Sequence, residues 1–301
     1  MFFEHLDVHL IRGLYMRSTP IVHLRGIDSS LGDAMIERLL RTHACIVVPH
    51  STVEELTARY SADLEFGECE LYGSDQVPFE AGHRLFLMGL GPFTAPSDGE
   101  RGFDVDGLEI VLALPGHLGI ETEHEWIDSH IEVHDLLPRR QDLVWQSPRF
   151  QTWMESLRSS GTVIANDSPQ YWWVSDIDVA DALVRILLSD EPFSSEMKIS
   201  GRRPWSEEQT LEELSLLYNR TVAGRTGRFS VEHLTAAPTP SIEVQSLIVQ
   251  PNLPMDVEEN ARKRPDLSPL HDLLHRIDGD GWRPLVPIRT ALMHSLADYI
   301  E

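Results

Sequence analysis

The sequence predicts a doubly wound α/β protein, in which a Rossmann-type parallel sheet is joined to a smaller, interleaved C-terminal lobe rich in helix. Two observations carry this prediction. In the first half of the chain, short apolar runs typical of strands buried on both faces alternate with helical patterns. From Ser147 onward, longer helical patterns replace that alternation.

A strand, a glycine turn and a helix open the predicted sheet. Pro20–Gly26 is a short β-branched run, and Leu31–His43 places its large apolar residues on one helical stripe. Ala44–Pro49 predicts a second buried strand, which is followed by a helix starting at Ser51. A third strand is expected near Leu64–Leu71, so these segments form βαβ units of a parallel sheet.

Two further apolar runs extend the sheet before the pattern changes. Arg84–Leu90 and Leu108–Leu114 are interpreted as the fourth and sixth strands. Helices are expected at Phe150–Leu157, at Ile177–Leu188 and, last in the chain, at Ile288–Ile300. The expected division is a nucleotide-binding core over residues 1–170, with a return strand near 171–176 and 196–201, and a mainly helical lobe over residues 177–301.

Local signals refine the second half. Ser206 and Gln209 form an S-x-x-Q capping box, which predicts the start of the helix over Leu211–Tyr218. The stretch Ala236–Arg264 is rich in proline, asparagine and charge and is expected to be irregular.

Composition excludes several classes of partner. The chain has 301 residues with 25 basic and 48 acidic side chains, a formal charge of −23 that repels nucleic acid and anionic lipid alike. No apolar run approaches the roughly 20 residues that a membrane span needs. Cys45 and Cys69 are isolated in apolar segments, which is typical of buried thiols in a reducing compartment. We therefore expect a cytoplasmic protein.

The turn after the first strand has the spacing of a dinucleotide-binding turn. It reads Gly26-Ile-Asp-Ser29-Ser-Leu-Gly32, and such glycines let the backbone approach a pyrophosphate that lies on the helix N-terminus. The candidate cofactor-binding residues of this turn are Gly26, Ser29, Ser30, Leu31 and Gly32. The two serine hydroxyls are equally consistent with binding phosphate oxygens or with satisfying a turn that has lost its ligand.

This turn resembles the GxxGxxG turn of the short-chain dehydrogenase/reductase family, with Ser29 in place of the middle glycine. Tyr171–Ala182 resembles the strand-to-helix junction of the family's extended branch, and Ile199–Leu214 resembles the strand, loop and helix that follow. Arg264-Pro-Asp266 and Gly281-Trp-Arg-Pro284 resemble its C-terminal signature. The extended branch includes nucleotide-sugar epimerases and dehydratases, so the resemblance implies a nucleotide-sugar ligand and NAD or NADP as cofactor.

The resemblance also suggests two substrate-binding residues. Arg264 matches an arginine that binds phosphate in the family, whereas Pro169 stands where another such arginine is often found. Tyr171, with Trp172 and Trp173, is able to stack on a base, although burial in a strand between the lobes is the commoner explanation for such a cluster.

The family's catalytic pair is absent. Its enzymes use Tyr-x-x-x-Lys, in which the lysine lowers the pKa of the tyrosine that acts as general base. The only lysines here, Lys198 and Lys263, have Ser194 and Glu259 four residues earlier. Gly91–Leu108 is also too short to hold two crossovers and a strand. We therefore expect no catalytic residue and no catalytic helix.

The predicted cofactor site is altered at a second place. The end of the second strand, where an acidic residue normally accepts hydrogen bonds from the ribose, reads Pro49-His50-Ser51. His50 and Ser51 are the candidate cofactor contacts there. A nucleotide diphosphate therefore remains a candidate ligand even without hydride transfer.

Other constellations favour structural explanations. His117, His124, His130 and His134 lie close in the sequence, and His130 and His134 would share one helical face at a spacing that suits a metal. The resemblance places them in a polar loop after the sixth strand, so no metal is expected. Asp176 is interpreted as the N-cap of the Ile177 helix and not as half of a catalytic pair with Asp178.

Two hypotheses of function follow. In the first, the chain is a degenerate, non-catalytic protein that binds a nucleotide or nucleotide sugar, or serves as a regulatory or assembly subunit with a protein partner or as a homo-oligomer. In the alternative, it is an active NAD(P)-dependent nucleotide-sugar epimerase, dehydratase or reductase with an unrecognised base such as Tyr72 or His117.

Overall fold

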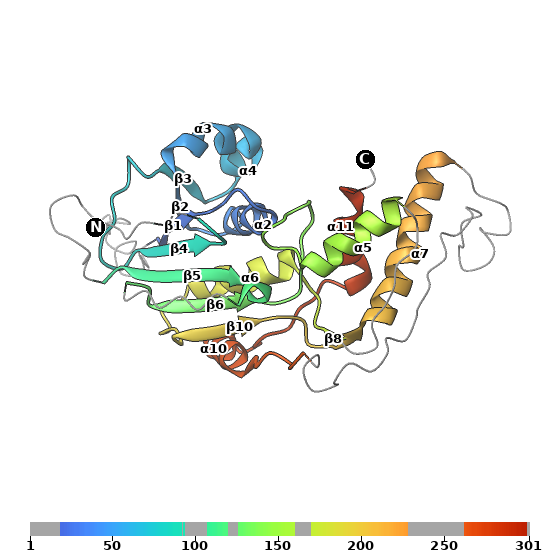
Figure 1. Ribbon diagram of the computed structural model, residues 1–301. Coiled ribbons are helices and arrows are strands. Elements are labelled where there is room, and N and C mark those ends of the chain that lie inside the picture. Colours follow the sequence, from blue (N-terminus) through green and yellow to red (C-terminus); the bar gives the residue numbers. More distant parts are fainter. Residues whose placement is uncertain are drawn as a thin grey trace, which may run out of the picture.

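The computed structural model describes residues 19–91, 93, 107–119, 126–159, 170–227 and 262–299. A seven-stranded parallel sheet with helices beside it forms the larger lobe, and a smaller helical lobe lies at one end (Figure 1). This is the predicted Rossmann-type α/β fold. No helix in the described ranges is long and apolar enough to cross a membrane.

The sheet has the strand order β3-β2-β1-β4-β5-β6-β10, and each neighbouring pair is parallel. Its strands are β1 (Ile21–Arg25), β2 (Cys45–Val48), β3 (Glu70–Gly73), β4 (Arg84–Met88), β5 (Glu109–Pro115), β6 (Ser129–Val133) and β10 (Glu196–Ile199). The order reverses between β1 and β4, and folds of this kind bind their ligands at the carboxyl ends of the strands on either side of such a reversal.

Helices of the larger lobe are α2 (Ser30–Leu39), α3 (His50–Arg59), α4 (Ser61–Phe66), α6 (Asp176–Leu187) and α10 (Ser268–Asp278). The smaller lobe contains α5 (Pro148–Ser159), α7 (Glu207–Thr226) and α11 (Ile288–Ala297). A 3-10 turn, η1 (Gly116–Leu118), follows β5, and four two-residue strands join the lobes: β7 (Leu136–Leu137), β8 (Gln170–Tyr171), β9 (Val174–Ser175) and β11 (Trp205–Ser206).

The two lobes have separate apolar cores whose segments interleave along the chain. The larger core joins one face of the sheet to α2, α6 and α10. The smaller core is made by α5, α7, α11 and the aromatic residues around Tyr171. The division of the chain near residue 170 stays a prediction. Helix α5 precedes that point and packs in the smaller core, whereas α6, β10 and α10 follow it and pack in the larger one.

The opposite face of the sheet carries no described helix. Connections from β3 to β4, β4 to β5 and β5 to β6 all step in the same direction across the sheet, so right-handed crossovers place them on this one face. The connection from β3 to β4 contains turns only, and that from β5 to β6 runs only from residue 116 to residue 128. In Figure 1 the face of β4, β5 and β6 toward the viewer accordingly has no described helix in front of it.

Several sequence predictions need correction. The third strand begins at Glu70, because Ser61–Phe66 continues as helix α4 beyond the turn at Tyr60. Leu108–Leu114 corresponds to the fifth strand, not the sixth, since β5 pairs directly with β4. Strands β4, β5 and β6 are therefore direct neighbours in the sheet. The short segments are the connections between strands on one face, such as that from β5 to β6.

The histidine-rich stretch was also misassigned. It was placed in a loop after the sixth strand, but Ser129–Val133 is itself that strand. His130 is therefore on a strand, not on a helix. The predicted return strand was wrong in part. Over residues 171–176, β8 pairs with β11 and β9 pairs with β7, both outside the main sheet. Over residues 196–201, β10 forms the last strand of the main sheet as predicted.

The helix starts agree more closely with prediction. The capping box of Ser206 and Gln209 begins α7 as predicted. The cap of α6, however, is Ser175 and not Asp176, since the Ser175 hydroxyl accepts from the N–H of Ile177. Of the expected irregular stretch Ala236–Arg264, residues 236–261 lie outside the described residues. Burial raises the pKa of the free thiols of Cys45 and Cys69 to about 11 and about 12, as expected for buried cysteines.

Candidate functional site

The glycine turn follows β1 at the carboxyl edge of the sheet. Gly26 has φ +71°, and a Cβ there would lie 2.1 Å from the Met88 carbonyl oxygen. A Cβ at Gly32 would lie 2.1 Å from the Ile27 carbonyl oxygen. Both glycines are thus required by close backbone approach, which is the geometry of a dinucleotide-binding turn. Leu31 is fully buried in the larger core and contributes packing.

Two N–H groups at the start of α2, those of Ser30 and Gly32, have side-chain partners within the chain. Ser29 is the N-cap, and its hydroxyl oxygen accepts from the N–H of Gly32 at 2.9 Å. The N–H of Ser30 donates to Oδ2 of Asp142 at 3.0 Å. The Ser30 hydroxyl donates to the fully buried Asp176 at 2.6 Å. The sequence was equally consistent with serine hydroxyls that bind phosphate oxygens and with hydroxyls that satisfy the turn. The contacts in the structure agree with the second hypothesis.

Charged side chains surround this turn. Arg139 pairs with Glu37 and Asp176, at 2.8 and 3.2 Å. Arg140 lies 3.0 Å from Asp33 and 3.6 Å from Asp28. Burial raises the pKa of Asp33, and the Arg140 and Arg59 guanidiniums act against that rise.

The end of β2 carries the other predicted cofactor contacts. His50 is the first residue of α3, and its Nδ1 lies 2.9 Å from Oδ1 of Asp75, which follows β3. Ser51 is exposed in the first turn of the same helix. These residues share the carboxyl edge with the glycine turn, because β1 and β2 are parallel neighbours. Their contact with a cofactor stays a prediction.

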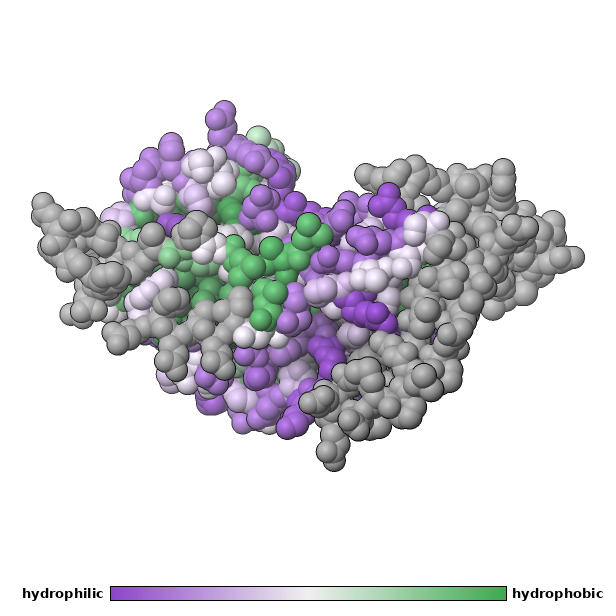
Figure 2. Space-filling view, in the orientation of Figure 1, coloured by the Kyte–Doolittle hydropathy of each residue, from purple (hydrophilic) through white to green (hydrophobic). Residues whose placement is uncertain are grey.

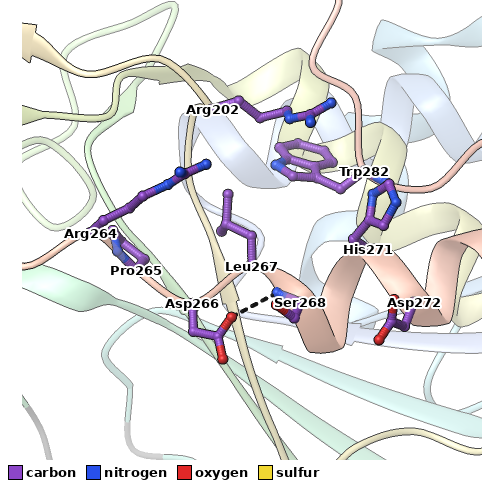
Figure 3. Close-up of a pocket in the computed structure, with 9 residues that line it drawn as sticks. All are labelled: Arg202, Arg264, Pro265, Asp266, Leu267, Ser268, His271, Asp272 and Trp282. Carbon is purple, nitrogen blue, oxygen red and sulfur yellow. Dashed lines mark hydrogen bonds between the residues drawn. The ribbon is translucent and has the colours of Figure 1, made fainter.

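A cavity of about 490 Å³ lies beside the start of α10. Figure 3 shows Arg264 on one side of it and Arg202 above the Trp282 ring on the other. The Nδ1 of His271 accepts from the N–H of Trp282 at 3.0 Å, so the neutral ring carries its proton on Nε2. Two guanidiniums and an imidazole N–H suit a phosphate or carboxylate group. The full lining is Arg202, Arg264, Pro265, Asp266, Leu267, Ser268, His271, Asp272 and Trp282.

Tyr171 is part of the smaller core. Its ring stacks on Trp173 at 4.7 Å, and the Arg262 guanidinium lies 4.8 Å from its centroid. Arg262 also pairs with the buried Asp135 at 2.8 Å. These contacts agree with the burial explanation of the aromatic cluster, and substrate contact by Tyr171 stays a prediction.

Asp135 marks the carboxyl end of β6 as a constrained place. Its φ of 53° is the only positive value among the described non-glycine residues. Its Oδ2 accepts from the N–H of Trp172 at 2.7 Å. A conformation of this kind is kept only where surrounding contacts enforce it, and such places concentrate at functional sites.

The two alternative bases differ in position. His117 follows β5 at the carboxyl edge, and burial lowers its pKa, which favours the neutral ring at neutral pH. Tyr72 is on β3 at the outer edge of the sheet, where the neighbouring Glu70 carboxylate raises its pKa. That shift opposes phenolate formation, so Tyr72 is the poorer candidate.

The remaining acidic and histidine candidates have structural contacts. Asp178 accepts from the N–H groups of Leu285 and Val286 and so ties α6 to the segment before α11. His134 and Lys198 both contact Glu132, at 3.0 and 2.9 Å. Across the described part of the chain, no three His, Cys, Asp or Glu side chains are grouped to hold a metal, and His124 lies outside it.

Sequence reasoning missed several of these residues. Asp142 and Arg139 contact α2 from more than a hundred positions away, and no local pattern indicates that contact. Arg202, His271 and Trp282 line the cavity with Arg264. Arg202 lies within the resembling segment Ile199–Leu214 and Trp282 within the Gly281–Pro284 motif, and these were the available signals for that group.

Comparison with known proteins identifies the fold. No protein-family model and no curated protein matches the sequence. Among solved structures, PbgP3 protein from Burkholderia pseudomallei superimposes with a TM-score of 0.56 at 10% identity, over 94% of this chain and 96% of that one. UDP-glucuronic acid 4-epimerase from Bacillus cereus, solved with UDP-glucuronic acid and NAD, gives 0.50 at 10% identity, over 93% and 99%. dTDP-glucose 4,6-dehydratase from Bacillus anthracis, solved with NAD, gives 0.50 at 7% identity, over 94% and 97%.

These similarities establish the fold. At such low identity they do not establish the chemistry, which has to be inferred from the residues of this chain. The two enzymes with those TM-scores hold NAD. In this chain the residues of the corresponding turn do not fit a dinucleotide. The Ser30 N–H is taken by a carboxylate, and the acidic ribose contact is replaced by His50, which is paired with Asp75.

Proposed function

We propose that this chain, which has the fold of nucleotide-sugar epimerases and dehydratases, is a non-catalytic cytoplasmic protein. It binds the anionic part of a nucleotide or nucleotide sugar and acts as a regulatory or assembly subunit. It performs no NAD-dependent reaction. In this proposal the fold supplies a rigid frame with a ligand pocket, not a redox centre.

The observation that carries the non-catalytic part is the short connection between β5 and β6. These strands are parallel neighbours, and the chain between them runs only from residue 116 to residue 128. A parallel crossover takes a dozen or more residues even without a long helix. The helix that would carry a Tyr-x-x-x-Lys pair has no room there, and the sequence contains no such pair.

The binding part rests on the cavity beside α10. Arg264, which matches a phosphate-binding arginine of the resembling family, reaches it together with Arg202. The chain is strongly acidic overall, and in this cavity two arginines balance the two aspartates of the lining, Asp266 and Asp272. The chemistry suits a diphosphate, since guanidiniums bind phosphate oxygens in pairs.

Calorimetry with a UDP-sugar tests this binding. We expect measurable binding by the wild type and a loss of about tenfold or more in Arg264→Ala, because charged hydrogen bonds contribute roughly 1.5–3 kcal/mol each. Arg203→Ala is the matched control, since Arg203 is also exposed but lies over Trp205, outside the cavity lining. Equal affinity in Arg264→Ala and the wild type would exclude this pocket.

A protein partner is part of the proposal because apolar side chains remain exposed at the carboxyl edge. Leu90 is 53% exposed, Leu143 68% and Leu118 37%. A Cβ at Gly89 would touch Val144, so the end of β4 and the loop carrying Leu143 are in contact. Figure 2 shows hydrophobic surface in the middle of the side turned toward the viewer, over the strands of the larger lobe. Exposed apolar patches of this kind mark interaction sites.

The second candidate function is an active enzyme with His117 as base. Its support is the position of His117 at the carboxyl edge, where a neutral imidazole can accept a proton. Incubation with NAD and a panel of nucleotide sugars distinguishes the two. Product formation that disappears in His117→Ala favours the enzyme, whereas binding without turnover favours the non-catalytic protein.

A further inference from the structure

The N-terminus of α2 is where a dinucleotide fold places its pyrophosphate. There the backbone N–H groups and the helix dipole together favour an anion. In this chain an anion of the protein itself is present, because the Ser30 N–H donates to the Asp142 carboxylate at 3.0 Å. The N–H of Gly32 is taken by the Ser29 hydroxyl at 2.9 Å. A phosphate oxygen that accepted from either of these N–H groups would have to displace the partner already bound to it.

The Asp142 carboxylate is fixed from its own side as well. Its other oxygen, Oδ1, accepts from the N–H groups of Val144 and Trp145, each at 3.1 Å. Trp145 is almost fully buried and belongs to the larger core. One carboxylate therefore joins three backbone N–H groups from two segments, and its position is set by the fold.

The loop that carries Asp142, residues 138–147, is hydrogen-bonded at two further places. Arg139 reaches the buried Asp176 through both its backbone N–H and its Nε. The carbonyl oxygen of Pro138 accepts from the buried Ser295 hydroxyl of α11 at 2.6 Å. With the contact to α2, these bonds hold the loop against the starts of two helices and against the smaller lobe.

The charges nearby oppose a second anion. Asp28 and Asp33 belong to the turn and the first turn of α2, and Arg140, which is near both, is already paired with them. A bound pyrophosphate would therefore lie near the carboxylates of Asp28, Asp33 and Asp142, while the nearby Arg140 is already paired with two of them. Such like-charge contact disfavours binding.

We propose that the Asp142 carboxylate takes the place of a dinucleotide pyrophosphate at the α2 N-terminus, so that residues 138–147 close the cofactor site from within. This inference is independent of the cavity beside α10, because Asp142 does not line that cavity. The loss of dinucleotide binding is then a built feature, in which an internal ligand satisfies the helix terminus that a cofactor would otherwise satisfy.

Binding of inorganic pyrophosphate and of NAD tests the inference on the full chain. We expect the wild type to bind neither, and Asp142→Ala to gain pyrophosphate affinity by at least roughly tenfold, since one charge-assisted hydrogen bond to the helix N-terminus becomes available. Asp142→Asn keeps an oxygen for Val144 and Trp145 and isolates the charge. Asp28→Asn is the matched control, because it removes a nearby charge without freeing the Ser30 N–H.

A measurement without ligand keeps the test decisive. Hydrogen exchange at the Ser30 amide should be at least roughly tenfold faster in Asp142→Ala than in the wild type, and unchanged in Asp28→Asn. Wild-type binding of NAD or pyrophosphate as tight as that of Asp142→Ala overturns the inference. So does an equal gain in Asp28→Asn, which would assign the effect to general charge. Loss of UDP-sugar binding in Arg264→Ala bears on the proposed function alone.

Discussion

Single atoms decide the geometry of the glycine turn. Gly26 combines a left-handed φ of +71° with a carbonyl oxygen, that of Met88, at the place where a Cβ would lie. Gly82 has a similar φ of +82° with nothing within 4 Å of a Cβ. This pair of residues separates the cost of backbone conformation from the cost of close approach.

Gly26→Ala should lower the free energy of unfolding by roughly 3 kcal/mol, since it adds a steric clash to an unfavourable φ. Gly82→Ala should cost only about 1 kcal/mol, which is the conformational part. Urea denaturation of both variants measures the difference. Equal losses would mean that the contact between the turn and β4 relaxes without cost.

The residues at the carboxyl edge of the sheet differ in whether the sequence alone could predict their place in the site. Gly26 and Gly32 were predictable because their spacing is local, and His50 because it follows a strand that an apolar run indicates. Asp142 was not predictable, since an aspartate in a polar stretch carries no signal of its partner. Only the fold brings it to Ser30.

Between elements, the contact of β1 with β4 buries a histidine pair. Nε2 of His23 lies 3.1 Å from Nδ1 of His83, and no partner is recorded for Nδ1 of His23 among the described residues. Burial, followed by the charges of His83 and Arg25, lowers the pKa of His23 from 6.5 to about 3. The folded protein therefore holds His23 neutral across the range in which an unfolded histidine takes up a proton.

This pair should make the sheet sensitive to acid. The pKa of His23 is lower in the folded than in the unfolded protein, so folding is favoured by the neutral ring. This contribution to the free energy of unfolding is fully present above pH 6.5 and is lost as the pH falls from 6.5 toward 3, by an amount on the order of 3 kcal/mol. Unfolding free energies of wild type and His23→Gln, measured from pH 7 to pH 4, should converge as the pH falls. Parallel curves for the two proteins would contradict the assignment.

Element lengths explain which parts of the fold were predictable. Helices α5, α6 and α7 follow from period and capping, which are local. The short crossovers on one face were predicted only in part, because the segment counted between Gly91 and Leu108 is the single connection from β4 to β5 and not two crossovers with a strand between them. The strand identities were not predictable, since β5 and an expected sixth strand have the same apolar pattern, and only pairing in the sheet distinguishes them.

At the scale of the whole molecule, one face of the sheet is covered by none of the helices that the described residues form. The side chains of β4 and β5 on that face form an apolar cluster of their own, including Leu85, Leu87 and Leu112. On the neighbouring β6 and β10 the same face carries His130, Glu132 and Lys198. The face therefore changes from apolar to charged across the sheet, and the apolar part continues toward the exposed leucines at the carboxyl edge.

Those leucines lead to a prediction about assembly. If the patch of Leu90, Leu118 and Leu143 is an interaction surface, Leu90→Ser with Leu143→Ser should weaken self-association or retention of a partner and should reduce the fluorescence of a dye that binds apolar surface. Both leucines are largely exposed, so the folded state should lose little stability, within about 0.5 kcal/mol. Light scattering and dye titration of the purified chain measure these effects.

Phe66→Ser is the matched control for this double variant. Phe66 is 84% exposed at the end of α4, which Figure 1 places at the top of the larger lobe. A general response to fewer exposed apolar side chains would appear in both variants. A response confined to Leu90 and Leu143 assigns association to the carboxyl edge. Leu143 lies within residues 138–147, the loop that closes the dinucleotide site, so partner binding there would depend on that loop staying in place. Equal association in all three proteins would remove the patch as an interface.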